Sequence, residues 1–178
     1  PREWSSDVCA SFLDNSFTIL NSDVNLDDSK GRALWALGYL ISEKRLLPEA
    51  ILADAQAIIQ KIIPRIEAIY SPRAMAFAIK GLYHYQMVSK SPENLKLIKI
   101  FADRLVQMYI HESNKNWEWF EGYLTYANSI LPEAMLYAWQ LTGEKVYREI
   151  AGSSFGFLLS KIFNKNGIEV ISHKNWLQ

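Results

Sequence analysis

Two Ser-Pro pairs constrain the fold of this chain more than any other feature. Ser71-Pro72 and Ser91-Pro92 each place a capping residue before a proline, and proline favours the first position of a helix. Apolar residues follow both pairs with helical spacing, which predicts one helix from Pro72 to about Ser89 and another from Pro92 to about Ile110. Helices joined by so short a turn run antiparallel. The centre of the chain is therefore predicted to be a helical hairpin.

Helical periodicity covers most of the remaining sequence. It predicts further helices over residues 4–19, from Asp28 or Ser29 through Ile41, from Pro48 to about Ile63, from Asn128 or Ser129 to just before Gly143, and from Lys145 to Phe163. Pro64 is expected to kink the chain before a last turn near Tyr70, and residues 168–171 alternate weakly, as in a short strand or extended tail. About seven helices with almost no sheet predict an all-α fold.

The recurrence of hairpins about 40 residues long predicts one domain over residues 1–178, built as an array of helical hairpins. Such an array is either an open arc or a closed (α/α) toroid. In both, every second helix begins at the same end of the domain. Three polar segments, residues 28–32, 71–73 and 117–128, would then meet at one rim, where helix N-termini also direct free N–H groups.

Residues 117–134 have the most unusual composition in the chain. The first twelve of them hold two Trp, two Tyr, a Phe, two Glu and an Asn, with no clean helical or strand period. Sugar rings stack their C–H faces on aromatic rings, and their hydroxyls bond to carboxylates and amides. This composition predicts a carbohydrate site, without deciding between binding and cleavage.

Two carboxylates and two arginines are the charged candidates at the rim. Asp28 and Glu121 could act as an acid/base pair across a glycosidic bond, for which carboxyl groups lie roughly 5–10 Å apart. The alternative is that Asp28 caps a helix and Glu121 accepts backbone N–H bonds. Arg32 and Arg73 fall in the first turns of helices, where cations are disfavoured. They would bind a ligand anion or a cluster of hydroxyls, or else form salt bridges to Asp28 or Glu121.

The aromatic residues and the amide are candidates for direct contact with a sugar. Trp117, Trp119, Tyr123 and Tyr126 could be stacking platforms, although at least one Trp is expected in the core, because aromatic residues are most often packing residues. Asn128 could bond a sugar hydroxyl or cap the helix that follows it.

Composition excludes several other classes of function. Lys plus Arg and Asp plus Glu number 19 each, so the net charge is zero and a nucleic-acid partner is not expected. No apolar run reaches the roughly 20 residues that cross a bilayer, and no signal peptide is visible, which favours a cytoplasmic protein. The single Cys9 is expected to be a buried apolar residue, and no metal site or cofactor motif is found. Because the chain begins with Pro1, it is expected to be a piece of a longer protein.

Three blocks of sequence resemble a known family. Residues 28–38 (DSKGRALWALG), 71–78 (SPRAMAFA) and 119–134 (WFEGYLTYANSILPEA) look like a bacterial helical domain found beside or fused to glycosyltransferases. Its fold is similar to the six-hairpin (α/α)6-toroid glycosidases, so the resemblance implies that fold and a carbohydrate context. The family commonly has Asp where this chain has Ala127, a departure that favours binding over catalysis. A complete ring has about twelve helices, against about seven predicted, so a partial ring is also possible.

Two hypotheses follow. The first is a carbohydrate-active or carbohydrate-binding domain that works with a glycosyltransferase or on a saccharide, with hydrolase-like acid/base chemistry if it is an enzyme. A sugar epimerase on the same fold would usually want His residues at the rim, where none of the three is predicted. The alternative is a non-catalytic scaffold that packs on a partner domain.

Overall fold

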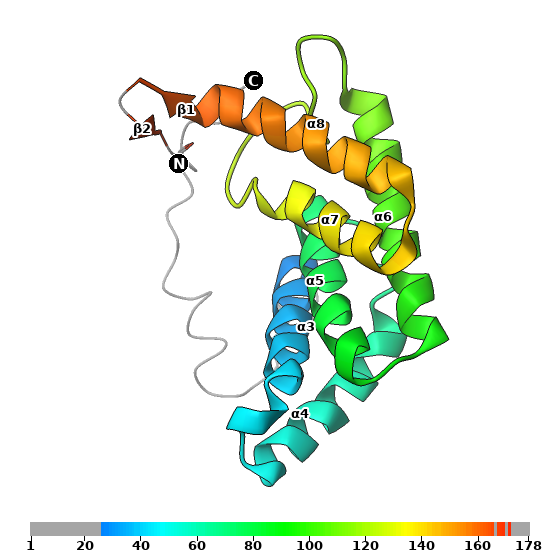
Figure 1. Cartoon of the computed structure of the whole chain (residues 1–178). Coiled ribbons are helices and arrows are strands. Elements are labelled where there is room, and N and C mark those ends of the chain that lie inside the picture. Colours follow the sequence, from blue (N-terminus) through cyan, green and yellow to red (C-terminus); the bar gives the residue numbers. More distant parts are fainter. Residues whose placement is uncertain (1–25, 166, 170, 172–178) are drawn as a thin grey trace, which may run out of the picture.

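A computed structural model describes residues 26–165, 167–169 and 171, and this part of the chain is mostly helical (Figure 1). Its α-helices are α3 (Asp27–Ser42), α4 (Glu49–Ile62), α5 (Pro72–Val88), α6 (Pro92–Glu112), α7 (Ile130–Thr142) and α8 (Lys145–Ile162). Short 3-10 turns, η1 (Lys44–Leu46) and η2 (Ile63–Arg65), flank α4, and β1 (Phe163–Asn164) pairs antiparallel with β2 (Gly167–Ile168). The all-α prediction is confirmed.

The two Ser-Pro pairs begin helices as predicted, although they differ in detail. Ser91 accepts hydrogen bonds through its Oγ from the backbone N–H groups of Glu93 and Asn94, at 3.2 and 3.5 Å. Ser71 precedes α5 in an extended conformation but makes no such side-chain bond. The α5 helix therefore relies on the fixed backbone of Pro72 and on tertiary contacts at its N-terminus.

Several element boundaries differ from the prediction. The α3 helix begins at Asp27 with Leu26 at its N-cap, so Asp28 lies in its first turn and does not cap it. Pro48 lies at the N-cap of α4, and not within its first turn. The α7 helix begins at Ile130 and not at Asn128 or Ser129, because the Asn128 side chain bonds within the preceding loop. The strand near residue 168 ends at Ile168. The helix expected over residues 4–19, with Cys9, lies outside the described residues.

The helices α3 and α5 run side by side in the same direction, and α7 crosses α5 obliquely (Figure 1). Gly31 of α3 faces Ala74 of α5, and Gly38 faces Gly81 seven residues further along both helices. The chain therefore runs in the same direction in α3 and α5. On the other flank of α5, Arg73 bonds Asn128 and Lys80 bonds Glu133 in the same sense. The expectation that alternate helices begin at one end of the domain is confirmed, and α4, α6 and α8 return the chain between them (Figure 1).

The α5 helix is the centre of this arrangement. Its residues 73–82 are buried without interruption. A Cβ atom on Gly38 would lie 2.1 Å from the carbonyl oxygen of Gly81, so only glycine permits so close a crossing of α3 and α5. The α5 helix is held by close backbone packing against α3 and by polar contacts on its other side. These contacts also fix the position of the rim at its N-terminus.

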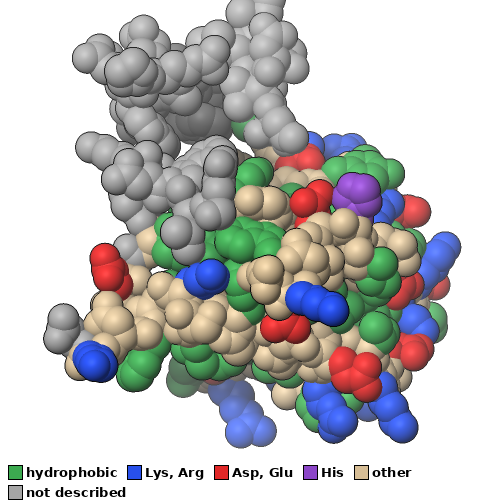
Figure 2. Space-filling view, turned by 90° about the horizontal axis from the view of Figure 1, so that it is seen from above, with side chains coloured by type: hydrophobic (Ala, Val, Ile, Leu, Met, Phe, Trp, Pro, Cys, Tyr) green, Lys and Arg blue, Asp and Glu red, His purple; other side chains and the backbone are tan. Residues whose placement is uncertain are grey.

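The surface of the molecule carries charges of both signs. Lys, Arg, Asp and Glu side chains are interspersed over the face seen in Figure 2, and no continuous basic patch is visible there. None of the described helices is long and apolar enough to cross a membrane.

Candidate functional site

Arg73 connects the first turn of α5 to the loop of residues 113–129, which joins α6 to α7. Its Nε donates a hydrogen bond to the carbonyl oxygen of Tyr126 at 2.7 Å, and its Nη1 donates to Oε2 of Glu121 at 2.7 Å. Its Nη2 donates to Oδ1 of Asn128 at 3.1 Å. The Arg73 side chain is only 5% exposed, so it is a buried cation whose charge is balanced by Glu121.

Asn128 closes the loop on itself. Its Oδ1 also accepts from the Thr125 N–H at 3.1 Å, and its Nδ2 donates to the Thr125 carbonyl at 2.9 Å. Between these residues, Ala127 adopts a left-handed backbone conformation with φ of 48°, which is unfavourable for a residue with a Cβ. The cap interpretation of Asn128 is wrong, because its amide holds the loop and not the N-terminus of α7.

The first turn of α3 lies beside the same loop. Arg32 donates to Oδ2 of Asp28 at 2.8 Å, and its guanidinium lies 4.2 Å from the centre of the Phe77 ring. The pKa of the Tyr126 phenol is raised, first by burial and then by the charge of Asp28, with Glu121 adding to the effect and the two arginines opposing it. The Tyr70 N–H also donates to Oδ2 of Asp27 at 3.3 Å, and the Arg73 guanidinium lies 4.9 Å from the centre of the Tyr126 ring, so the three predicted segments lie side by side.

Salt bridges explain both arginines. Arg32 pairs with Asp28 and Arg73 pairs with Glu121, as one of the two sequence interpretations expected. Asp28 retains one buried carboxylate oxygen, Oδ1, without a hydrogen-bond partner. The Asp28 and Glu121 carboxylates are thus each engaged by a neighbouring guanidinium.

The two tryptophans occupy different environments. Trp119 has no exposed surface and packs edge-to-face on Phe120 at 5.4 Å, so it is a core residue and cannot serve as a stacking surface in this conformation. Trp117 is half-buried, and its Nε1 donates to the Glu121 carbonyl at 2.7 Å. Tyr126 is 45% exposed and is the most accessible aromatic ring of the rim candidates.

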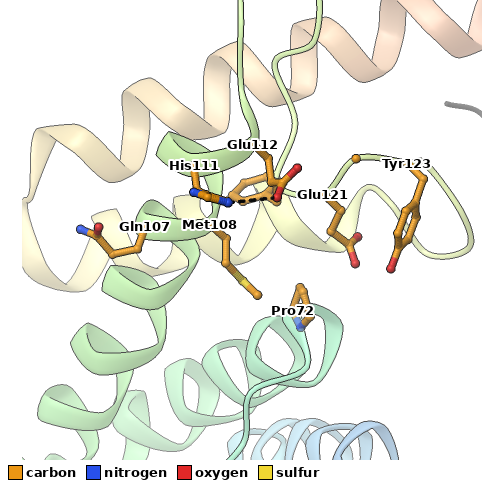
Figure 3. A pocket seen from close by; sticks show the side chains of 9 residues that line it. Pro72, Gln107, Met108, His111, Glu112, Glu121 and Tyr123 are labelled. Carbon is orange, nitrogen blue, oxygen red and sulfur yellow. Dashed lines mark ion pairs between the residues drawn. The ribbon is translucent and has the colours of Figure 1, made fainter.

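A pocket of about 530 Å³ opens beside Glu121, between the end of α6 and the loop (Figure 3). Its walls combine a carboxylate pair, a phenol, an amide, an imidazole and apolar groups; they are formed by Pro72, Gln107, Met108, His111, Glu112, Phe120, Glu121, Gly122 and Tyr123. In Figure 3, Glu121 and Tyr123 extend side by side from the loop, and Glu112 lies near them at the end of α6. The polar groups of the pocket therefore come from two segments, the end of α6 and the loop of residues 113–129.

Glu112 is one of the pocket residues that the sequence analysis missed, together with Gln107, Met108 and His111. Its Oε2 lies 3.7 Å from the position of a Cβ atom on Gly122, and His111 Nε2 lies 3.7 Å from its Oε1. The pKa of the Tyr123 phenol is raised by burial and then by Glu121, with a smaller contribution from Glu112. In the sequence Glu112 resembles any charged residue in the last turn of an amphipathic helix, so no local signal marks it.

No group of three or more His, Cys, Asp or Glu residues that could hold a metal ion occurs among the described residues. Comparison of the chain with family models, with curated proteins and with solved structures finds no match.

Proposed function

We propose that this domain binds a carbohydrate in the pocket beside Glu121. The observation that carries the proposal is the composition of its walls. Glu112, Glu121, Tyr123 and Gln107 offer hydrogen-bond acceptors and donors, while Met108 and neighbouring apolar side chains offer a hydrophobic surface. A saccharide ring presents hydroxyls at its edge and C–H groups on its faces, so it matches both kinds of wall.

The arrangement of the helices supports a partial (α/α) toroid as the scaffold of this site. Along the chain α3, α5 and α7, whose N-terminal ends lie near one another, alternate with α4, α6 and α8, as inner and outer helices do in such a ring. The described helices correspond to half of the six hairpins of a full ring. Association with a glycosyltransferase domain, which the sequence resemblance implies, is part of the same proposal.

Binding fits the geometry better than cleavage does. Glycoside hydrolysis needs one carboxyl group that donates a proton and a second that acts as base or nucleophile. Here Oε2 of Glu121 accepts from the buried Arg73, and Asp28 pairs with Arg32, so both candidates already act as partners in ion pairs. The pocket's own pair, Glu112 and Glu121, is suited to accepting hydrogen bonds from hydroxyl groups.

The test is a glycan array followed by calorimetric titration of the full chain with the saccharides that bind. We expect Glu112→Gln to weaken binding about tenfold, because hydrogen bonds to a charged acceptor contribute about 1.5–3 kcal/mol. Glu118→Gln is the matched control, since Glu118 is exposed in the same loop and does not line the pocket. Binding of no saccharide, or equal affinity of the two variants, would refute the proposal.

A scaffold is the second candidate, and the surface between α7 and α8 favours it. Leu136 and Phe155 are 41% and 47% exposed there and line a hollow of about 300 Å³ with Ser129, Pro132 and Glu133. An exposed apolar hollow of this kind is typical of a surface that packs against an apolar face of another protein molecule. If it mediates association, sedimentation of the chain will depend on concentration, and Phe155→Ser will remove this dependence. A monomer at every concentration would count against association of two copies through this surface.

A further inference from the structure

A strip of aromatic and polar side chains crosses α3, α5 and α7 below the rim. It consists of two rows, about one helical turn apart. The first row is Trp35, Lys80 and Glu133, with Lys80 Nζ 4.1 Å from the centre of the Trp35 ring and 2.9 Å from Glu133 Oε1. The second row is Tyr39, His84 and Tyr137, with ring centres 5.1 Å apart for Tyr39–His84 and 5.8 Å apart for His84–Tyr137.

The Lys80–Glu133 pair holds a carboxylate at the surface. The Lys80 side chain is only 7% exposed, whereas the Glu133 side chain is 43% exposed. Such a pair contributes little net stability, because apolar residues of similar size usually serve a core equally well. The pair does fix the orientation of a hydrogen-bond acceptor. Buried Lys80 holds the Glu133 carboxylate in place, while the solvent-facing side of that carboxylate stays accessible.

The strip carries no net charge near neutral pH. Lys80 and Glu133 neutralise each other. The pKa of His84 is lowered, chiefly by burial and then by the charge of Lys80, with Glu43 and Glu133 opposing, so its ring is neutral and offers one donor and one acceptor. A neutral strip with the exposed Tyr39 ring and fixed polar groups suits an uncharged ligand rich in hydroxyls.

We propose that this strip binds a linear, uncharged saccharide chain, as a surface separate from the pocket beside Glu121. Sugar faces stack on the half-exposed Tyr39, while Glu133 and His84 bond the hydroxyls. The second row places three rings in succession, with centres 5.1 and 5.8 Å apart, and so offers contacts to more than one sugar ring. The strip therefore distinguishes chains from single sugars. The strip and the pocket beside Glu121 would bind the same class of ligand, a carbohydrate, and in this respect the proposal rests on the proposed function.

The experiment is calorimetric titration of the full chain with maltohexaose, cellohexaose, xylohexaose and chitohexaose, each compared with its monosaccharide. At least one hexasaccharide is expected to bind about tenfold more tightly than its monomer. Tyr39→Ala should weaken hexasaccharide binding about fivefold and leave monosaccharide binding unchanged. Tyr70→Ala, which removes a tyrosine 64% exposed outside the strip, is the matched control. His84→Gln is a second strip variant, and thermal unfolding verifies that each variant folds.

The outcomes separate the two proposals. Equal affinity for monomers and hexamers, or equal effects of Tyr39→Ala and Tyr70→Ala, would overturn the strip and leave the pocket intact. Loss of monosaccharide binding in Glu112→Gln, with the preference for hexamers retained, would support two separate surfaces. If no saccharide of either length binds, both the strip and the proposed function fail.

Discussion

The α5 helix contacts its neighbours α3 and α7 by different means. Toward α3 the contact is between backbones, with Gly38 against Gly81. Toward α7 and the loop before it, the contact is made by long charged side chains, Arg73 and Lys80. The α3 flank has the closest backbone contact, although Arg32 and Lys80 also lie against aromatic rings there, and the α7 flank carries the ion pairs of Arg73 and Lys80.

The difference shows where a small helical domain can place chemistry. Glycine contacts fix the distance between two helices but leave no room for functional groups. Charged side chains span a larger gap and carry hydrogen-bonding capacity into it, at the cost of burying ions. The candidate pocket and the strip both lie where polar groups hold α5, and three substitutions test this contrast.

Removal of the Arg73 guanidinium should have the largest effect. Arg73→Met leaves the Glu121 carboxylate without its cation and frees the carbonyl of Tyr126, so we expect a loss of about 3–5 kcal/mol in the free energy of unfolding. Urea denaturation measures this loss. Arg32→Met is the control, because its ion pair is exposed and contributes about 1 kcal/mol or less. Similar losses in both variants would mean that the polar flank is not held by Arg73.

The glycine flank is tested by adding a single methyl group. Gly38→Ala places a Cβ atom 2.1 Å from a backbone oxygen of Gly81, which must force α3 and α5 apart. The expected cost is about 1–3 kcal/mol or somewhat more. The same change at Gly152 in α8 meets no atom within 4 Å and should instead stabilise the helix by up to about 1 kcal/mol. If both variants gain stability, the close crossing is not rigid.

The smallest effect concerns strain within the loop that Arg73 holds. Ala127→Gly removes the Cβ from a residue with φ of 48°, and we expect a gain of about 0.5–1 kcal/mol after the added chain entropy is subtracted. Ala33→Gly, at an exposed position inside α3, should lose about 1 kcal/mol. A loss at both positions would show that the loop carries no backbone strain.

Much of the fold could be predicted from local signals. Pro72 and Pro92 begin helices where proline fixes the backbone, and Gly143 ends α7 in a left-handed conformation with φ of 74°. The pairing of the two arginines with nearby carboxylates was one of two interpretations, and the salt-bridge interpretation is confirmed. These features depend on neighbours in sequence or on the simple geometry of hairpins.

The details of the site could not be predicted in the same way. Trp117 and Trp119 lie two residues apart in a loop without periodicity, so nothing local showed which ring is buried. Glu112 reaches the pocket only because α6 ends beside the loop. The helix expected over residues 4–19 and the burial of Cys9 stay predictions, because they lie outside the described residues.

The fixed pairing of the parallel helices limits how the length of this chain can vary. One residue inserted near the middle of α5 would turn everything after it by about 100° about the helix axis. Gly81 would then no longer face Gly38, while Arg73, which precedes the insertion, would still bond Glu121 in the loop. Insertions and deletions among related sequences should therefore collect in the turns beside η1 and between α5 and α6, and leave the spacing from Arg73 to Gly81 unchanged.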